Sequence, residues 1–334
     1  MVNFLGKRFK VVILNSPHPS FDIEKSILED IADLRIVWCN RPEEVIQVSK
    51  DADAIMAADI AHVPLTKEIL SHLRKVKVIS TYGVGTDAID LKAAKEYNIV
   101  VANVPDYGIS EVADHTMALV LSLIRKVPML DKALREQGWG RVRGNIDYIR
   151  NTFGGIRRLN MLNFGLIGFG RIARAVAERA KVFGFKVLAY DPYVPKEVFK
   201  KAGVQSVEFD SLLKESDIIS IHVLLTKETK HMIGEQEFKK MKKSAYIVNT
   251  SRGAVIDENA LIKALKEKTI AGAALDVFEK EPLSKDNPLL QMDNVILTPH
   301  IAWYSEEAML DQKRKAALNV KCVLTGRPPP YLLT

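Results

Sequence analysis

Short apolar runs rich in valine and isoleucine alternate along the chain with amphipathic stretches of helical length. This alternation is typical of a parallel sheet in which a helix connects each strand to the next, and it occurs here in two series. Strands of the first series are predicted at 11–14, 34–38, 54–57, 76–81 and 99–103. Strands of the second series are predicted at 163–167, 186–190, 217–221, 245–248, 272–274 and 295–297. We therefore expect an α/β fold with two doubly wound parallel sheets, Rossmann-like or flavodoxin-like.

The length of the chain also fits two domains. Its 334 residues compare with roughly 150 residues for an average domain. Helices at 111–125 and 128–136 are predicted to join the two series. Two further helices are predicted at 22–32 and 306–324, and the second of these ends before Gly326 and three prolines, which are typical stop signals.

Composition and charge exclude several classes of protein. The formal net charge is +7, but the basic residues are scattered and mixed with acids, which argues against a nucleic-acid partner. Cys39 and Cys322 lie far apart with no cysteine or histidine at ligand spacing, so neither a disulfide framework nor a metal site is expected. The sequence has no apolar run of the ~18 residues that a membrane span needs and no apolar signal region at its start. We expect a cytoplasmic protein without a membrane partner.

A glycine-rich turn is the sharpest local signal. Gly168, Gly170 and Ala173 follow the predicted strand 163–167 and open a helix. The first glycine of such a turn makes the tight bend, the second lets the backbone approach a pyrophosphate, and the small third residue lets helix and strand pack closely. By itself the spacing also fits a plain strand–helix turn. Asp191 at the end of the next predicted strand favours NAD over NADP, because an acid there binds the adenosine ribose and repels a 2′-phosphate.

Three ionisable residues follow later strands of the second series, namely Arg252, Glu281 and His300. Open parallel sheets bind ligands beyond the carboxyl ends of their strands, so these side chains can meet at one edge. Each of them alone also fits an ordinary structural role, as a loop cation, a surface acid or a core imidazole. His222 ends another predicted strand, but no acid lies near it in the sequence. We therefore interpret His222 as a cofactor-loop residue.

Six motifs carry a resemblance to a known family. They are YGVGTDAID at 82–90, GLIGFGRIA at 165–173, YDPY at 190–193, NTSRGAVID at 249–257, GAALDVFEKEP at 272–282 and TPHIAWYSE at 298–306. Together they make the chain resemble the D-isomer-specific 2-hydroxyacid dehydrogenase family over nearly its whole length. The last motif is most similar to the branch that includes the C-terminal-binding proteins, which are transcriptional co-repressors as well as weak dehydrogenases.

The resemblance implies two domains with the active site in the cleft between them. A substrate domain would comprise residues 1–106 and 302–334, and an NAD-binding Rossmann domain, residues 107–301, would be inserted between them. The resemblance also implies a homodimer built around the cofactor domain.

The resemblance further implies an NAD-dependent oxidoreductase that transfers a hydride between NADH and a small 2-keto acid or D-2-hydroxy acid. His300 would carry the proton, because an imidazole exchanges protons near neutral pH, and Glu281 would bind its far ring nitrogen. Arg252 would anchor the carboxylate and the keto oxygen of the substrate. Contacts with the cofactor are expected from Thr116, Gly168, Gly170, Arg171, Ile172, Asp191, His222, Thr250 and Asp276.

Substrate contacts are expected from the amides of Val84 and Gly85, although a tight turn alone would also account for this loop. Trp303 fits a wall of the substrate pocket and an ordinary packing aromatic equally well. The stretch 57–65 has no arginine to hold a substrate phosphate, which favours unphosphorylated acids over 3-phosphoglycerate. A different class of function stays open, namely an NAD(H)-sensing scaffold of the C-terminal-binding-protein type that binds a partner protein with little catalysis.

Overall fold

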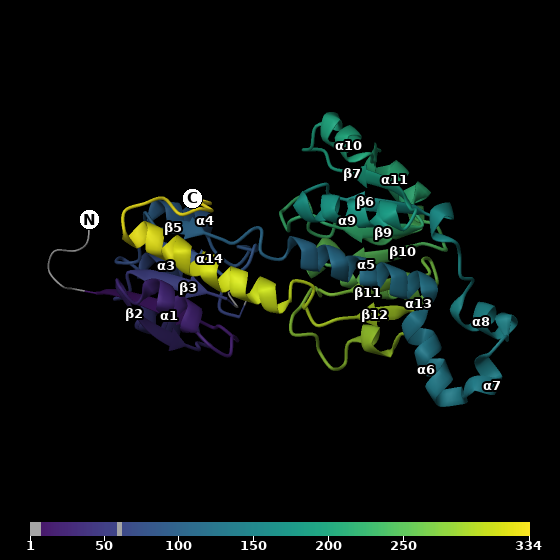
Figure 1. The fold of residues 1–334 in the computed structure, drawn as a ribbon, viewed down its shortest axis with the longest axis horizontal. Helices are drawn as coiled ribbons and strands as arrows, with labels where there is room; N and C mark the ends of the chain where they lie inside the picture. The colour runs from purple at the N-terminus through teal and green to yellow at the C-terminus, as the bar shows by residue number, and fades with distance from the viewer. Residues whose placement is uncertain (1–7, 59–61) are drawn as a thin grey trace. The chain divides into compact units, whose positions relative to one another are not determined.

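The computed structural model describes residues 8–58 and 62–334 (Figure 1). The chain forms two compact units. The terminal unit contains the described part of Met1–Gly108 together with Ser305–Thr334, and the inserted unit is Ile109–Tyr304. Each unit has one parallel β-sheet with a buried apolar cluster on either face. The prediction of two doubly wound α/β units is therefore confirmed.

The terminal unit has a five-stranded sheet in the order β2-β1-β3-β4-β5. Its strands are β1 (Phe9–Leu14), β2 (Ala32–Val37), β3 (Ala54–Ala57), β4 (Val78–Thr81) and β5 (Val100–Ala102). Its helices are α1 (Asp22–Leu28), α2 (Pro42–Ser49), α3 (Lys67–Ser71), α4 (Leu91–Glu96) and α14 (Glu306–Leu324). Helices α1 and α14 cover one face of the sheet, and α2, α3 and α4 cover the other. The two segments of the terminal unit thus share one core.

One predicted helix boundary in this unit is wrong. The helix expected at 22–32 ends at Leu28, because Ala32 already begins β2 and pairs with Phe9 of β1. Pairing in the sheet satisfies the backbone groups of this segment, and such tertiary contacts override a weak local preference for helix. The helix expected at 306–324 is α14 with the same bounds, and the Ser305 side chain caps it by accepting a hydrogen bond from the Ala308 amide.

The inserted unit has a seven-stranded parallel sheet in the order β12-β11-β10-β9-β6-β7-β8. Its strands are β6 (Asn163–Ile167), β7 (Lys186–Tyr190), β8 (Gln205–Ser206), β9 (Ile218–Ile221), β10 (Tyr246–Asn249), β11 (Gly272–Leu275) and β12 (Val295–Leu297). Its longer helices are α5 (Ile109–Arg125), α6 (Val127–Gln137), α8 (Ile146–Phe153), α9 (Arg171–Val182) and α13 (Glu258–Lys266). The shorter helices are α7 (Trp139–Val142), α10 (Lys196–Ala202), α11 (Phe209–Glu215) and α12 (Glu235–Lys240), with 3-10 turns η1 (Leu159–Met161), η2 (Gly253–Val255) and η3 (Pro288–Gln291).

Helices α5 and α9 pack on one face of this sheet, and α11, α12 and α13 pack on the other. Strand β8 and helices α7 and α8 have no counterpart among the predicted elements. Strand β8 has two exposed residues, too few to show a hydrophobic period, and α8 buries no residue. The hydrophobic pattern therefore located the other strands of the two sheets and missed elements that bury few or no residues.

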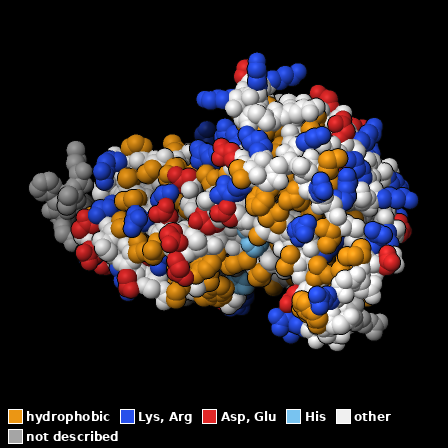
Figure 2. Space-filling view, turned by 45° about the vertical axis from the view of Figure 1, so that its right-hand side comes forward, with side chains coloured by type: hydrophobic (Ala, Val, Ile, Leu, Met, Phe, Trp, Pro, Cys, Tyr) orange, Lys and Arg blue, Asp and Glu red, His pale blue; other side chains and the backbone are white. Residues whose placement is uncertain are grey.

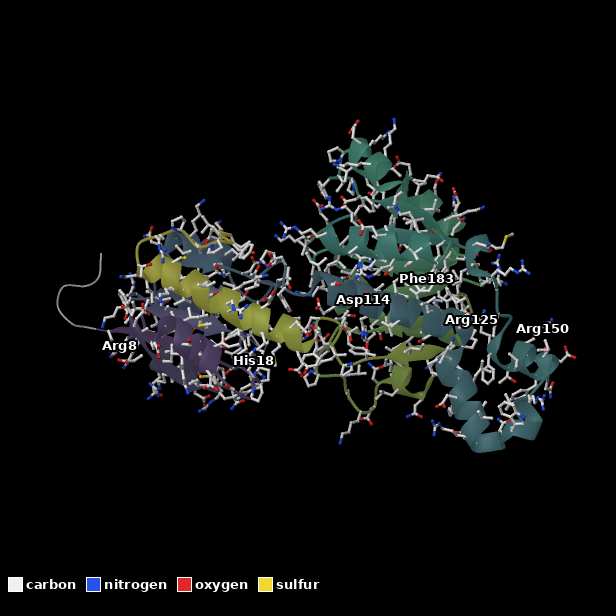
Figure 3. All side chains as sticks on the ribbon, viewed as in Figure 1. Arg8, His18, Asp114, Arg125, Arg150 and Phe183 are labelled. Carbon is white, nitrogen blue, oxygen red and sulfur yellow. The ribbon has the colours of Figure 1, made fainter. Side chains whose placement is uncertain are left out.

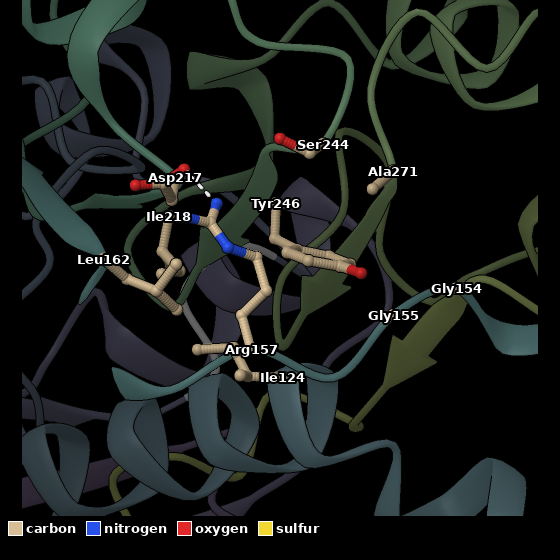
Figure 4. Close-up of a pocket in the computed structure, with 10 residues that line it drawn as sticks. All are labelled: Ile124, Gly154, Gly155, Arg157, Leu162, Asp217, Ile218, Ser244, Tyr246 and Ala271. Atoms are coloured by element: carbon tan, nitrogen blue, oxygen red, sulfur yellow. Dashed lines mark hydrogen bonds and ion pairs between the residues drawn. The ribbon is translucent and has the colours of Figure 1, made fainter. Parts of the chain in front are cut away.

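Lys126 is a buried cation between α5 and α6. Its side chain is 3% exposed, and its Nζ donates a hydrogen bond of 2.5 Å to the Tyr246 hydroxyl. The Tyr246 ring lines a cavity of about 190 Å³ at the edge of the sheet where β6, β9 and β10 begin (Figure 4). In this cavity the Arg157 guanidinium donates to the Asp217 carboxylate at 3.0 Å. Burial lowers the pKa of Lys126 to about 8.

We expect Lys126→Met to raise the free energy of unfolding at pH 7, because methionine occupies similar space without a buried charge. The pKa of this lysine falls from 10.5 to about 8 on folding, which corresponds to a gain of about 3 kcal/mol at most. Between these two pH values the unfolded chain holds a proton that the folded chain has released. The stability of the native protein therefore rises with pH in this window, and the advantage of the variant shrinks.

Urea unfolding at pH 7 and pH 10 measures both effects of this substitution. Lys243→Met is the matched control, since Lys243 is exposed and a surface change alters stability by roughly 0.5 kcal/mol or less. A Lys126→Met protein no more stable than the control at pH 7 would contradict the prediction.

Candidate active site

Arg252, Glu281 and His300 lie beyond the carboxyl ends of three adjacent parallel strands, β10, β11 and β12. The Nδ1 atom of His300 lies 2.6 Å from Oε2 of Glu281. The other carboxylate oxygen of Glu281 accepts a hydrogen bond of 2.9 Å from the Phe278 amide, which fixes the carboxylate in place. The imidazole is 44% exposed, and its contact with Glu281 is made through Nδ1 and not through Nε2.

The Arg252 segment is held against the Glu281 segment by a glycine. A Cβ atom on Gly253 would lie 1.9 Å from the backbone carbon and oxygen of Phe278, so only glycine allows this approach of two backbones. The Asn249 side chain donates to the Arg252 carbonyl at 2.9 Å and fixes the turn from within. The structure therefore brings the three predicted residues together.

The charge of Glu281 is set by its neighbours. Burial raises the pKa of this carboxyl, but four favourable contributions together outweigh it. These are the hydrogen bond from His300, its charge, the Phe278 amide and the charge of Arg252. The net pKa of Glu281 lies below its usual value, so Glu281 is an anion at neutral pH and can hold the His300 ring in one orientation.

His222 is in a different environment. Its Nε2 atom lies 2.9 Å from the Ser220 hydroxyl, and burial lowers the pKa of His222 to about 3. It is therefore neutral at physiological pH and a poor proton carrier. Its carbonyl oxygen instead contacts the glycine-rich turn, where a Cβ on Gly168 would lie 2.5 Å from it.

The glycine-rich turn fits a dinucleotide. Gly168 has a φ of +88°, in the left-handed region that favours glycine. Gly170 has open space where its Cβ would be, and it directly precedes α9, whose first amides at Arg171 and Ile172 have no partner within the helix. A pyrophosphate requires such a free approach and such amides.

Asp191 lies at the end of β7, beside this turn. Its two carboxylate oxygens accept hydrogen bonds from the backbone amides of Phe169 at 2.8 Å and Tyr193 at 3.0 Å. Each oxygen keeps a further lone pair for a ribose hydroxyl. The structure therefore orients the acid that the sequence predicts to select NAD.

Three residues expected to contact the cofactor are instead bonded within the protein. The buried Thr116 hydroxyl donates to the Val112 carbonyl at 2.7 Å and lies 2.9 Å from the Thr250 hydroxyl. Asp276 is 1% exposed, and its carboxylate accepts bonds from the Thr298 hydroxyl and two backbone amides. Direct cofactor contacts by these three residues stay predictions.

Two residues of this network, His115 and Thr298, were not singled out by the sequence. His115 on α5 lies 3.0 Å from the Thr298 hydroxyl, across 183 residues of chain. No spacing rule connects residues so far apart, and an isolated histidine on a helix is usually structural.

The predicted substrate residues belong to different units. Val84 and Gly85 lie in the terminal unit after β4, where the Asn103 side chain donates to the Val84 carbonyl at 2.8 Å. Trp303 is in the inserted unit, and its indole nitrogen donates to the His300 carbonyl at 3.1 Å. The stretch 57–65 includes residues 59–61, which lie outside the described residues.

Residues 117–302 match the family described as D-isomer specific 2-hydroxyacid dehydrogenase, NAD binding domain. The chain is 43% identical over 301 residues to a D-3-phosphoglycerate dehydrogenase of Methanocaldococcus jannaschii, covering 90% of this chain and 55% of that protein. It is 39% identical to a glyoxylate reductase of Thermofilum pendens, covering 95% of this chain and 91% of that protein. The chain thus spans about half the length of the phosphoglycerate dehydrogenase and nearly all of the reductase.

Solved structures agree with these matches. A D-lactate dehydrogenase from Aquifex aeolicus, in complex with NAD and lactic acid, superimposes with a TM-score of 0.83 and 34% identity. The match covers 95% of this chain and 96% of that one. In the described part of the chain, no helix has the length and apolarity required to cross a membrane.

Proposed function

Because the chain belongs to the D-isomer-specific 2-hydroxyacid dehydrogenase family, we propose that it interconverts a small 2-keto acid and the D-2-hydroxy acid with NAD as its cofactor. The observation that carries this proposal is the 2.6 Å contact between His300 and Glu281. This pair lies beside Arg252, at the carboxyl edge of the sheet that also holds the glycine-rich turn.

When bound, NADH would supply the hydride for the reduction of the keto carbon. His300 donates the proton to the keto oxygen from Nε2, and Glu281 stabilises the imidazolium that holds this proton by accepting from Nδ1. In the oxidation direction the same nitrogen of His300 takes the proton back. Arg252 presents two parallel N–H donors to the substrate carboxylate and its neighbouring oxygen.

We propose substrate and cofactor contacts for the remaining predicted residues. The amides of Val84 and Gly85 bind the substrate carboxylate, and Trp303 forms an apolar wall of the pocket beside His300. The amides of Arg171 and Ile172 bind the pyrophosphate at the start of α9. The terminal unit supplies substrate contacts in this proposal, and the inserted unit binds NAD.

A panel of 2-keto acids with NADH tests the proposed activity. We expect turnover of at least one of glyoxylate, pyruvate, hydroxypyruvate and a bulkier apolar 2-keto acid, measured by NADH absorbance. We also expect a lower kcat/KM for 3-phosphohydroxypyruvate, because the proposed pocket offers an apolar wall and no cationic side chain that would bind the phosphate group. Turnover of the phosphorylated acid alone would overturn the proposed substrate class and leave the dehydrogenase chemistry standing.

We expect kcat/KM with NADH to exceed that with NADPH by at least about tenfold, because the Asp191 carboxylate repels a 2′-phosphate in a partly desolvated site. Asp191→Asn removes the charge and keeps a side chain of the same shape. The ratio of the NADPH and NADH dissociation constants, measured by titration, should therefore approach one in this variant. An unchanged ratio would show that another residue selects the cofactor.

No observation on the described residues specifically favours the alternative function, an NAD(H)-sensing scaffold that binds a partner protein. The relatives described above are named as dehydrogenases and a reductase, and none of them is named a C-terminal-binding protein. Tight binding of NADH together with a complete lack of turnover in the panel would favour the scaffold.

Lys and Arg are interspersed with Asp and Glu on the face in Figure 2, and a nucleic-acid partner is not part of the proposal. We propose the cytoplasm as the location, on the grounds of the sequence alone.

We also propose that the inserted unit forms a homodimer. Helices α6, α7 and α8 extend away from its sheet (Figure 1), and large apolar side chains on them are exposed. Trp139 is 63% exposed and Ile146 59% exposed. Phe183, at the end of α9, is also exposed (Figure 3). Exposed apolar side chains of this size favour burial against a partner, and sedimentation velocity distinguishes a dimer from a monomer.

A further inference from the structure

A chain of hydrogen bonds links helix α5 to the segment that carries His300. The Thr298 hydroxyl donates to Oδ1 of Asp276 at 2.6 Å, and Nε2 of His115 lies 3.0 Å from the same hydroxyl. Since the hydroxyl hydrogen is used by the carboxylate, its oxygen must accept from His115. The contact therefore requires a proton on Nε2 of His115. The same Nε2 atom lies 3.7 Å from Oδ1 of Asp276, so it also faces the carboxylate.

Asp276 in turn holds the backbone around His300. Its Oδ1 accepts from the Ile301 amide at 3.0 Å, and its Oδ2 accepts from the Ala302 amide at 2.9 Å. Its own carbonyl accepts from the His300 amide at 2.8 Å. One buried residue thus binds three consecutive amides of the segment.

The segment needs this support because His300 has a φ of +52°. Residues other than glycine rarely adopt such a left-handed backbone and keep it only where the surrounding structure determines it. The direction of the imidazole toward Glu281 depends on that backbone. A shift of the Asp276 carboxylate would therefore displace the His300 ring.

We propose that His115 and Thr298 are positioning residues for His300, acting through the Asp276 carboxylate. The proposal rests on the proposed role of His300 as the proton carrier. Neither residue touches the reacting atoms in this arrangement. Thr298 donates to the Asp276 carboxylate and fixes its orientation, and His115 in turn binds the Thr298 hydroxyl. The Asp276 carboxylate then holds the backbone that carries His300.

Paired substitutions test each link of the chain. Thr298→Val removes the hydroxyl with little change in shape, and Thr298→Ser retains it. His115→Leu removes the donor, and His115→Gln offers an N–H at a similar reach. We expect Thr298→Val and His115→Leu to lower kcat by about tenfold, with the dissociation constant of NADH changed by less than about twofold. The serine and glutamine variants should recover most of the loss.

Asp114→Asn is the control on the same helix, because Asp114 (Figure 3) accepts a hydrogen bond of 2.5 Å from Arg179, which is not a member of this network. It should leave kcat at the native value. The double variant Thr298→Val with His115→Leu should be no slower than the slower single variant, since both changes break one chain of contacts. Fully multiplicative losses, or no recovery with serine, would overturn the proposal.

Amide hydrogen exchange separates this inference from the proposed function. We expect Thr298→Val to accelerate exchange of the Ile301 and Ala302 amides, whether or not the protein turns over a 2-keto acid. In the His300→Ala background, Thr298→Val should cause no further loss of kcat. Faster exchange with native kcat, a lower melting temperature with native kcat, or a further tenfold loss in that background would each show that the network does not act through His300.

Discussion

Replacing His300 by alanine is expected to lower kcat by about 10²–10⁴-fold, the range typical of losing a general acid. The dissociation constant of NADH should stay within about twofold, because His300 is placed at the substrate carbonyl and not in the glycine-rich turn. Steady-state reduction of the best 2-keto acid and fluorescence titration with NADH measure the two quantities. The loss follows from removing the imidazole that donates the proton, whose Nδ1 lies 2.6 Å from the Glu281 carboxylate.

A second variant separates loss of the proton from loss of the backbone conformation. His300→Asn removes the titrating ring but tolerates a φ of +52° better than alanine, since asparagine adopts the left-handed region more readily. We expect kcat to be lowered to a similar degree in His300→Ala and His300→Asn. If His222→Ala shows this loss and His300→Ala does not, the assignment of the proton carrier is wrong.

We expect Gly253→Ala to lower kcat/KM by about 10²-fold, the cost of displacing a substrate-positioning group by about 1 Å. The new methyl group would lie 1.9 Å from the backbone of Phe278, and neither backbone segment can yield as a flexible side chain would. The turn that carries Arg252 must then move away from Glu281. The melting temperature should fall as well, because the same displacement opens the packing between the two segments.

Gly155→Ala is the control for this substitution. Its Cβ would meet no atom within 4 Å, so the variant should keep the native kcat/KM and melting temperature. Binding of NADH by Gly253→Ala shows whether the rest of the inserted unit is intact. Native kcat/KM in the Gly253→Ala protein would mean that the turn adapts and that the close approach does not position Arg252.

Much of the fold could be predicted because the elements of the two cores repeat with a regular period. The strand predicted at 163–167 is β6 with the same bounds, and the glycine-rich turn follows it as expected. The helix predicted at 22–32 was the exception, since its last residues joined a sheet instead. Local preference is weak at such a boundary, and pairing with a distant strand decides it.

The candidate site divides in the same way. Arg252, Glu281 and His300 could be named from sequence because each follows a strand of a parallel sheet, and parallel strands present their carboxyl ends at one edge. The order of the strands and the distances within the site could not be predicted from the sequence. The contact between Glu281 and His300 was expected only from the family resemblance, and no pattern in the residues shows that His222 is buried with its pKa lowered to about 3.

By itself the sequence determined the α/β class, the glycine-rich dinucleotide turn and the family. It also determined the acid that follows the next strand, Asp191, which is predicted to favour NAD over NADP. Those properties depend on local periods and on motifs whose residues are close neighbours in the chain. Only the tertiary structure decided that Gly253 lets two backbones approach closely, that Asp276 supports the His300 segment, and that His115 reaches Thr298. These contacts join residues up to 183 positions apart, and their geometry arises from the packing of helix against sheet, which no local pattern specifies.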